Sequence, residues 1–161
     1  MGALVLVLIL GGFQNRAEVP VAPVPALRQG PTLVVLLKEG CPCIQECRTQ
    51  LNAMARACRG KIKFVGVLNA NGAKTKRLIE SASLDFPVLP DPTTSAIRAL
   101  HGRETLNIRL LSAKGAVLAG WEGLSRSIIR DVAYQTREMI KVEIIFDVQN
   151  LTSLTKSGCR F

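Results

Sequence analysis

A chain of 161 residues has the length of about one domain, and a composition that is 48% hydrophobic can supply a core without help from disulfides. The net charge of +9 is spread along the chain, with no basic run interleaved with aromatic residues, so we expect no nucleic-acid binding. No Ser-His-Asp set can be built around the single histidine, and no glycine-rich phosphate loop appears. These observations argue against hydrolase and nucleotide-binding functions.

The first 17 residues begin with an apolar run, Met1 to Phe13, that lacks charged side chains. A bilayer span needs about 20 apolar residues, so we expect no integral membrane span. The run instead resembles the hydrophobic region of a secretory signal peptide, which predicts an exported protein, periplasmic or extracellular. Because a basic segment and a clean cleavage site are missing, two alternatives stay open: an uncleaved N-terminal membrane tether, or a buried N-terminal strand.

Three prolines in residues 18–30 favour an extended linker. The linker leads to a compact domain that we assign to residues 31–141. Residues 142–161 then form a C-terminal extension that ends in a cysteine-containing tail.

The domain begins with Thr32 to Leu37, a β-branched and leucine-rich run typical of a buried strand. A helix is expected after Pro42, ending at Arg59 and Gly60. The later predicted elements are a strand over 61–68, a helix over 74–83, a proline-bounded edge segment over 85–92, a helix over 93–100, strands over 106–111 and 116–121, a helix over 125–140 and a strand over 142–148. This order predicts an α/β fold: a central mixed sheet with helices on both faces.

Three cysteines, Cys41, Cys43 and Cys47, cluster where the first strand leads into the first helix. A thiol must ionise before it attacks a disulfide, and a helix N-terminus favours the thiolate. Lys38 and Arg48 lie near enough in sequence to add positive charge. Cys41 is the best candidate for the nucleophile.

The remaining two cysteines have different expected roles. Cys58 falls on the apolar face of the first helix, which predicts a core residue. Cys159 lies in the tail and is a candidate for the resolving cysteine, because a flexible end can fold back over the site. Cys43 and Cys47 are the other candidates for that role, and spacing does not choose among the three.

The order of elements, with cysteines between the first strand and first helix, resembles the thioredoxin superfamily. Within it the chain resembles the redoxin branch, which holds AhpC/TSA-type peroxiredoxins and exported thiol-disulfide oxidoreductases. The resemblance covers residues 31–140 and is carried by segments 34–41, 86–92 (FPVLPDP), 110–115 and 121–123.

The sequence departs from the family pattern in three respects. Ile44 stands where the second cysteine of a Cys-x-x-Cys motif is expected. The motif is instead Cys-Pro-Cys, with three residues between Cys43 and Cys47. The Pro and Thr or Ser that precede a peroxidatic cysteine are missing, which disfavours peroxidase activity. Leu106 aligns with the superfamily's cis-proline, and a cis peptide before a non-proline residue costs about 3 kcal/mol.

The resemblance implies a thiol-disulfide oxidoreductase that acts on protein thiols and disulfides without a cofactor. Two alternatives remain. The spacing of Cys43 and Cys47 resembles that of Sco-type copper chaperones, in which case His101 would complete a Cu(I) site. The chain could instead be a non-catalytic thioredoxin-fold binding protein with structural disulfides. Nothing in the sequence indicates the oligomeric state.

Overall fold

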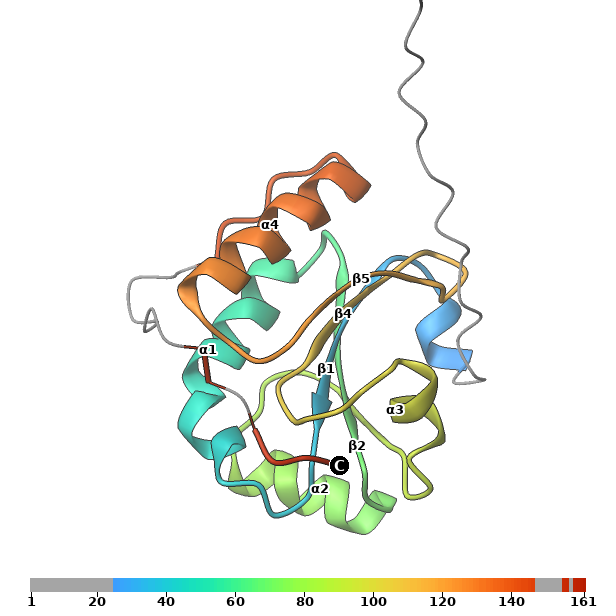
Figure 1. Ribbon diagram of the computed structural model, residues 1–161, viewed down its shortest axis with the longest axis vertical. Coiled ribbons are helices and arrows are strands. Elements are labelled where there is room, and N and C mark those ends of the chain that lie inside the picture. The colour runs from blue at the N-terminus through green and yellow to red at the C-terminus, as the bar shows by residue number, and fades with distance from the viewer. Residues whose placement is uncertain (1–24, 147–154, 157) are drawn as a thin grey trace, which may run out of the picture.

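The computed structural model describes residues 25–146, 155–156 and 158–161. The described chain begins with a short 3-10 helix and then alternates strands and helices (Figure 1). In order, the elements are η1 (Pro25–Arg28), β1 (Thr32–Leu37), α1 (Cys43–Cys58), β2 (Lys63–Leu68), α2 (Gly72–Ser81), β3 (Val88–Pro90), α3 (Ser95–Ala99), β4 (Ile108–Leu111), β5 (Val117–Trp121) and α4 (Arg126–Ile140). Apart from the strand expected over 142–148, strand and helix positions agree with the sequence-based expectations to within a few residues.

The five strands form one sheet in the order β3-β2-β1-β4-β5. β1 pairs in parallel with β2, which pairs in parallel with β3. β4 is antiparallel to β1 and forms a hairpin with β5. The predicted mixed sheet is therefore confirmed, with β1 at its centre and buried along its whole length.

Helices cover both faces of this sheet, which is why β1 is apolar at every position after its first. Leu33, Val35 and Leu37 face the first hydrophobic core, which they share with α1 and α4. Val34 and Leu36 face the second core, where η1 and α3 pack. The ribbon places α1 and α4 on one side of the sheet and α3 on the other (Figure 1).

Both ends of the domain differ from the expected boundaries. Leu27 of η1 is fully buried in the second core, so packing begins within the stretch that the sequence assigns to the linker. Lys141 ends α4 in a left-handed conformation, after which Ile144 and Phe146 pack into the first core without a strand partner. The predicted strand is thus wrong over 142–146, while 147–148, like the predicted signal peptide and residues 18–24, lie outside the described residues.

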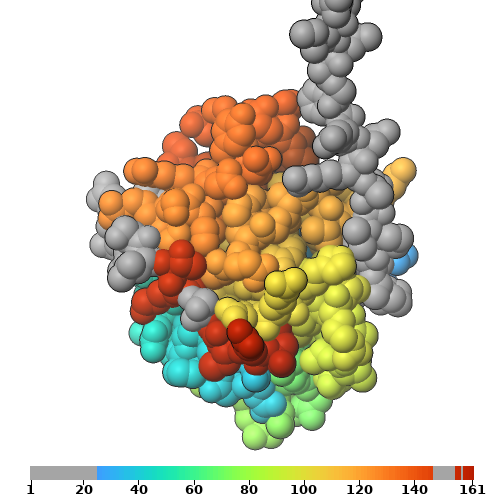
Figure 2. Space-filling view, in the orientation of Figure 1, coloured from blue at the N-terminus to red at the C-terminus, as the bar shows by residue number. Residues whose placement is uncertain are grey.

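Residues 155–156 and 158–161, here called the C-terminal segment, return to the start of α1. Figure 2 shows this segment on the surface, over the first turn of α1 and the loop that follows α3. Among the helices that the structure describes, none has the length and hydropathy needed to cross a bilayer.

Candidate thiol site

The loop between β1 and α1 places Cys41 at the end of the central strand. Gly40 adopts a φ of +75°, a conformation that costs glycine little, and the Cys41 N–H donates to the Lys38 carbonyl at 3.2 Å. Pro42 occupies the N-cap position, so α1 begins at Cys43. Asn69 holds the loop from the neighbouring β2 end, where its side chain accepts the Glu39 N–H at 2.6 Å.

Cys41 and Cys43 form the centre of the site. Their Sγ atoms lie 2.6 Å apart, and their exposed fractions are only 6% and 8%. Cys47 lies one turn further along α1, buried in the first core at 3% exposure. The structure therefore brings the first two predicted site cysteines into contact and places the third deeper in the helix interface.

Cys159 is the second thiol beside Cys41. Its main-chain N–H donates to Cys41 Sγ at 3.4 Å, and its carbonyl accepts the Thr105 N–H at 3.0 Å. Cys159 itself remains exposed. The tail cysteine thus lies beside Cys41, and its resolving role stays a prediction.

Main-chain pairing holds the C-terminal segment in place. The Phe161 N–H donates to the Arg103 carbonyl at 3.1 Å, one antiparallel step from the Cys159–Thr105 bond. Lys156 and Leu124 exchange two further bonds of 2.8 and 2.9 Å. The segment therefore pairs with two loops, one after α3 and one after β5.

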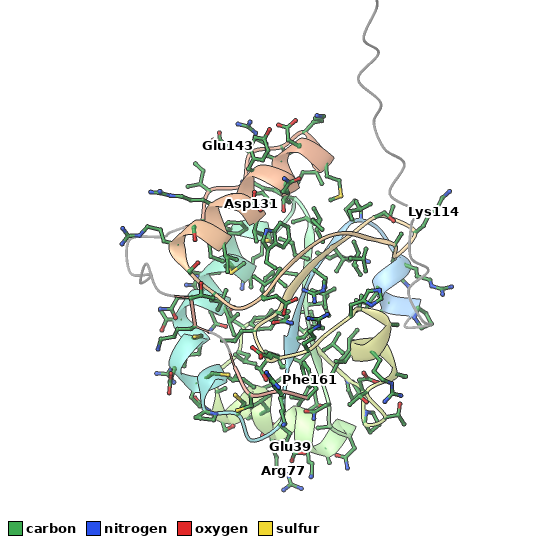
Figure 3. All side chains as sticks on the ribbon, viewed as in Figure 1. Glu39, Arg77, Lys114, Asp131, Glu143 and Phe161 are labelled. Atoms are coloured by element: carbon green, nitrogen blue, oxygen red, sulfur yellow. The ribbon has the colours of Figure 1, made fainter. Side chains whose placement is uncertain are left out.

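Side chains add to this attachment. Lys156 forms an ion pair with Glu46 of α1 at 3.2 Å, and Arg160 pairs with Glu104 at 3.6 Å. The ammonium group of Lys38 donates to the Arg160 carbonyl. Figure 3 labels Phe161 at the end of the molecule that also carries Glu39, next to Lys38.

Burial and hydrogen bonding give the two central thiols very different pKa values. Burial acts to raise the pKa of Cys41, but hydrogen bonds from the thiols of Cys159 and Cys43 outweigh it and lower the pKa from 9.0 to about 7. Burial, with a further contribution from Cys41, raises the pKa of Cys43 far above the ordinary thiol range. Cys41 is therefore the thiol that ionises near neutral pH.

Lys38, which the sequence predicts to favour the Cys41 thiolate, is not among the causes that shift the pKa of Cys41. Lys38 contacts the C-terminal segment and lowers the pKa of Cys159, although hydrogen bonding to Cys41 raises that pKa more. Burial raises the pKa of Cys47, and it raises that of Cys58, a core residue as predicted, to about 12.

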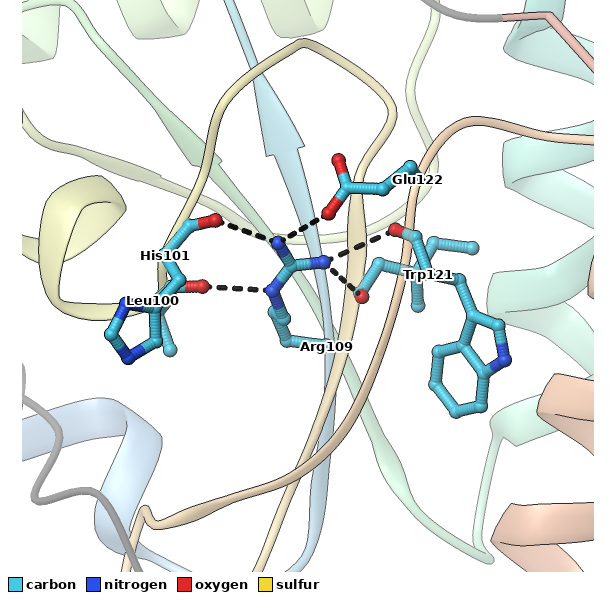
Figure 4. Close-up of polar contacts among 6 residues, drawn as sticks. Leu100, His101, Arg109, Trp121 and Glu122 are labelled. Atoms are coloured by element: carbon cyan, nitrogen blue, oxygen red, sulfur yellow. Dashed lines mark hydrogen bonds and ion pairs between the residues drawn. The ribbon is translucent and has the colours of Figure 1, made fainter.

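Arg109 joins the two loops that hold the C-terminal segment (Figure 4). Its guanidinium, 5% exposed, donates to the carbonyls of Leu100 and His101 after α3 and to those of Ile108 and Trp121, and it pairs with Glu122 at 3.0 Å. The loop between these anchors contains Thr105 and Leu106. Leu106 adopts a φ of +70° there, and no peptide bond among the described residues is cis.

The structure does not assemble the predicted copper ligands. His101 follows α3 on the opposite face of the sheet from α1, and its carbonyl is held by Arg109. Within the described residues, no group of three or more His, Cys, Asp or Glu side chains is arranged to hold a metal ion. Copper binding by Cys43, Cys47 and His101 stays a prediction that no contact in this part of the chain favours.

Several residues that shape the site were missed in the sequence. Three of them contact the C-terminal segment because of where they lie in the fold, and nothing in the local sequence predicts this role: Glu104, Thr105 and Leu124. Arg109 does carry a signal, because it is an arginine within an otherwise apolar strand and such a charge needs buried partners.

No protein-family model matches the sequence, and no curated protein matches it significantly. Solved structures do match. An uncharacterized conserved protein from Geobacillus kaustophilus superposes with a TM-score of 0.61 at 15% identity, over 85% of this chain and 79% of the other. A thiol:disulfide interchange protein from Bacteroides sp. gives a TM-score of 0.56 at 14% identity, over 74% and 78%. The pneumococcal exposed lipoprotein thioredoxin from Streptococcus pneumoniae gives 0.58 at 11% identity, over 71% and 88%. The chain thus has the thioredoxin-like fold that the sequence predicts.

Proposed function

We propose that this thioredoxin-fold protein is a thiol-disulfide oxidoreductase in which Cys41 is the nucleophile and Cys43 resolves the mixed disulfide. One observation carries the proposal: the 2.6 Å contact between the two sulfur atoms at the start of α1. A second thiol in contact with the first is the arrangement that a dithiol–disulfide exchange reaction requires.

The difference in pKa between Cys41 and Cys43 determines which thiol attacks the partner first. With a pKa of about 7, roughly half of the Cys41 thiols are ionised at neutral pH, compared with roughly one in a hundred at the ordinary value of 9.0. The Cys41 thiolate attacks one sulfur of a partner disulfide. A Cys41–partner bond forms, the partner's S–S bond breaks, and the other partner sulfur leaves as a thiolate with the electron pair.

Cys43 completes the exchange. The negative charge of Cys41 is one of the causes that keep the Cys43 proton in place, and that charge disappears once Cys41 is in a mixed disulfide. Cys43 then loses its proton more readily and attacks Cys41 Sγ. The products are a Cys41–Cys43 disulfide and a reduced partner thiol, so two electrons pass from the protein to its partner.

Cys47 and Cys159 are weaker candidates for the resolving role. No hydrogen bond links Cys47 with Cys41 in the described structure, and burial raises the Cys47 pKa. Cys159 contacts Cys41, but it lies on a segment that itself covers the site.

We expect the protein to act outside the cytoplasm on protein disulfides. Disulfides persist in oxidising compartments, and the apolar start of the sequence predicts export. The S. pneumoniae protein described above is an exposed lipoprotein by name. A membrane tether through the N-terminal residues is the alternative to free secretion.

The test is the stoichiometric reduction of a small aromatic disulfide by the reduced protein in a Cys159→Ser background, because the exposed Cys159 thiol would otherwise react with the disulfide itself. We expect Cys41→Ser to abolish turnover and Cys43→Ser to stop the reaction at a mixed disulfide on Cys41, detectable by mass spectrometry. Cys58→Ala is the matched control, because Cys58 is buried away from the site, and it should react as the parent does. Full activity in Cys41→Ser would refute the proposal, and a Cys41 disulfide that resists mild reductant would favour the non-catalytic alternative.

A further inference from the structure

The C-terminal segment contacts the two central cysteines and pairs with the rest of the domain through two isolated antiparallel bridges. The Thr105–Cys159 and Arg103–Phe161 main-chain bonds form one antiparallel bridge, and the pair of bonds with Leu124 forms a second. Main-chain pairing of this kind is how extended peptides bind to exposed backbone in many proteins, because it uses no particular side chain. The surface that the segment covers, between Thr105 and Leu124, is here called the groove, and it is thus suited to a polypeptide in general.

Side-chain contacts give this groove a preference. Glu46 and Glu104 each face a cationic side chain of the segment, those of Lys156 and Arg160. Space is restricted beside the cysteine: a Cβ at Gly158 would lie 2.6 Å from the Thr105 Cβ and 3.0 Å from Cys43 Sγ. The groove therefore fits glycine immediately before the cysteine, and cations three residues before it and one residue after it.

We propose that this groove is the binding site for the substrate polypeptide and that the C-terminal segment is a built-in competitor with the same chemistry. The favoured substrate is an extended chain in which a disulfide-bonded cysteine follows glycine and is flanked by basic residues. The proposal rests on the proposed function, because it takes Cys41 as the attacking thiol.

The segment can cover the site without reacting with Cys41, because a thiol is not a substrate for disulfide exchange. Cys41 attacks a substrate sulfur in the place now held by Cys159, which breaks the substrate's S–S bond and releases the second sulfur as a thiolate. In the reduced chain Cys159 is a thiol, with no S–S bond to break. The segment must therefore leave before the substrate enters, and the rate with a peptide depends on the fraction of molecules with an open groove.

The first test opens the groove in the full chain with Gly158→Ala, whose new Cβ clashes with Thr105. The matched control is Gly72→Ala, because a Cβ at Gly72 meets no atom within 4 Å. Both variants carry Cys159→Ser, so that the exposed tail thiol does not react, and they are compared with Cys159→Ser alone. The probe is a peptide with the sequence of residues 155–161 whose cysteine is linked to thionitrobenzoate, and the readout is the rate of thionitrobenzoate release.

If the groove is open in about a tenth of the molecules, Gly158→Ala should raise this rate about tenfold, with Gly72→Ala unchanged. The rates are compared on the plateau at about pH 10.5, where even a thiol with the ordinary pKa of 9.0 is largely ionised. At lower pH, Gly158→Ala should also move the inflection of the rate profile upward, because the main-chain N–H of residue 159, which Cys159→Ser retains, no longer donates to Cys41. An unchanged or lower rate at the plateau would overturn the role of the segment.

The second test concerns the side chains. A peptide with glutamate in place of both basic residues, and another with valine in place of glycine, should each react more slowly with the opened variant than the parent peptide does. Equal rates for all three peptides would overturn the preference.

A small uncharged disulfide, 2,2′-dithiodipyridine, separates the two proposals. If Cys41 does not react with it in any variant, the proposed function fails. If Cys41 reacts with it while Gly158→Ala brings no gain with the peptide, the proposed function stands and the inference about the groove fails.

Discussion

The Sγ atom of Cys41 lies between two other thiol-bearing residues: it is 2.6 Å from Cys43 Sγ and accepts the main-chain N–H of Cys159 at 3.4 Å. The two partners reach it by different routes, one through the first turn of α1 and the other through a segment that is more than a hundred residues distant in sequence. The acidity of Cys41 thus depends on both ends of the domain.

The first prediction is the pH dependence of alkylation at Cys41. Because the pKa of Cys41 is lowered to about 7, its reaction with iodoacetamide should rise with pH through that value and level off above it. Cys159→Ala removes one of the hydrogen bonds that lower this pKa, so the inflection should move upward, while Cys58→Ala should leave it in place. Modified peptides are quantified by mass spectrometry, and an inflection near 9.0 in the parent protein would contradict the prediction.

The second prediction is a loss of stability in alkali that depends on Cys58. Burial raises the Cys58 pKa from 9.0 to about 12, so between these values the unfolded chain has lost a proton that the folded chain retains. The free energy of unfolding therefore falls as pH rises, by about 1.4 kcal/mol per pH unit for this group at most. Cys58→Ala should reduce that slope, at a cost of about 1 kcal/mol at neutral pH for lost packing.

Guanidinium unfolding curves at several pH values above 9.0 measure this slope. The other buried thiols contribute equally to parent and variant, so they cancel in the comparison. Parallel pH profiles for the two proteins would show that Cys58 does not hold its proton.

The third prediction separates the two members of the Arg109–Glu122 pair. Arg109→Met leaves buried carbonyls without a donor, so we expect a loss of about 3–5 kcal/mol in the free energy of unfolding. Glu122 is 56% exposed, and Glu122→Gln should cost at most about 1 kcal/mol. Similar losses in the free energy of unfolding in the two variants would show that Arg109 stabilises the fold through the ion pair and not through the carbonyl contacts.

The fourth prediction concerns copper. Because His101 lies on the face of the sheet opposite α1, we expect His101→Ala to leave Cu(I) binding by the reduced protein unchanged in a spectroscopic titration. Weaker binding in the variant would restore the ligand set that the sequence suggests.

Local pattern was sufficient to predict most of the fold. The apolar run of β1, the proline before α1 and the glycine turn between β4 and β5 each determine a local structure, and the strand–helix–strand order constrains the topology. The strand predicted over 142–148 failed over its described part because an apolar run does not reveal whether a partner strand is free. Ile144 and Phe146 satisfy the same pattern by packing into the first core.

The site was predicted less completely. The contact between Cys41 and Cys43 follows from their separation by one residue at a helix start. The contacts of Cys159 with Cys41 and Thr105 join positions far apart in the chain, and no periodicity encodes them. The cause of the lowered Cys41 pKa was missed for the same reason. The sequence pointed to Lys38 and Arg48, whereas burial raises this pKa and hydrogen bonds with Cys159 and Cys43 lower it by more.

Arg109 also bears on how tightly a peptide can be held. By joining Leu100 and His101 to Trp121 and Glu122, it orders the loops on either side of the groove when the domain folds. When a peptide pairs with Thr105 and Leu124, the peptide therefore loses conformational entropy, but the protein, whose loops are already ordered, loses little. Weakening Arg109 should therefore reduce affinity for peptides even where no atom of Arg109 touches them.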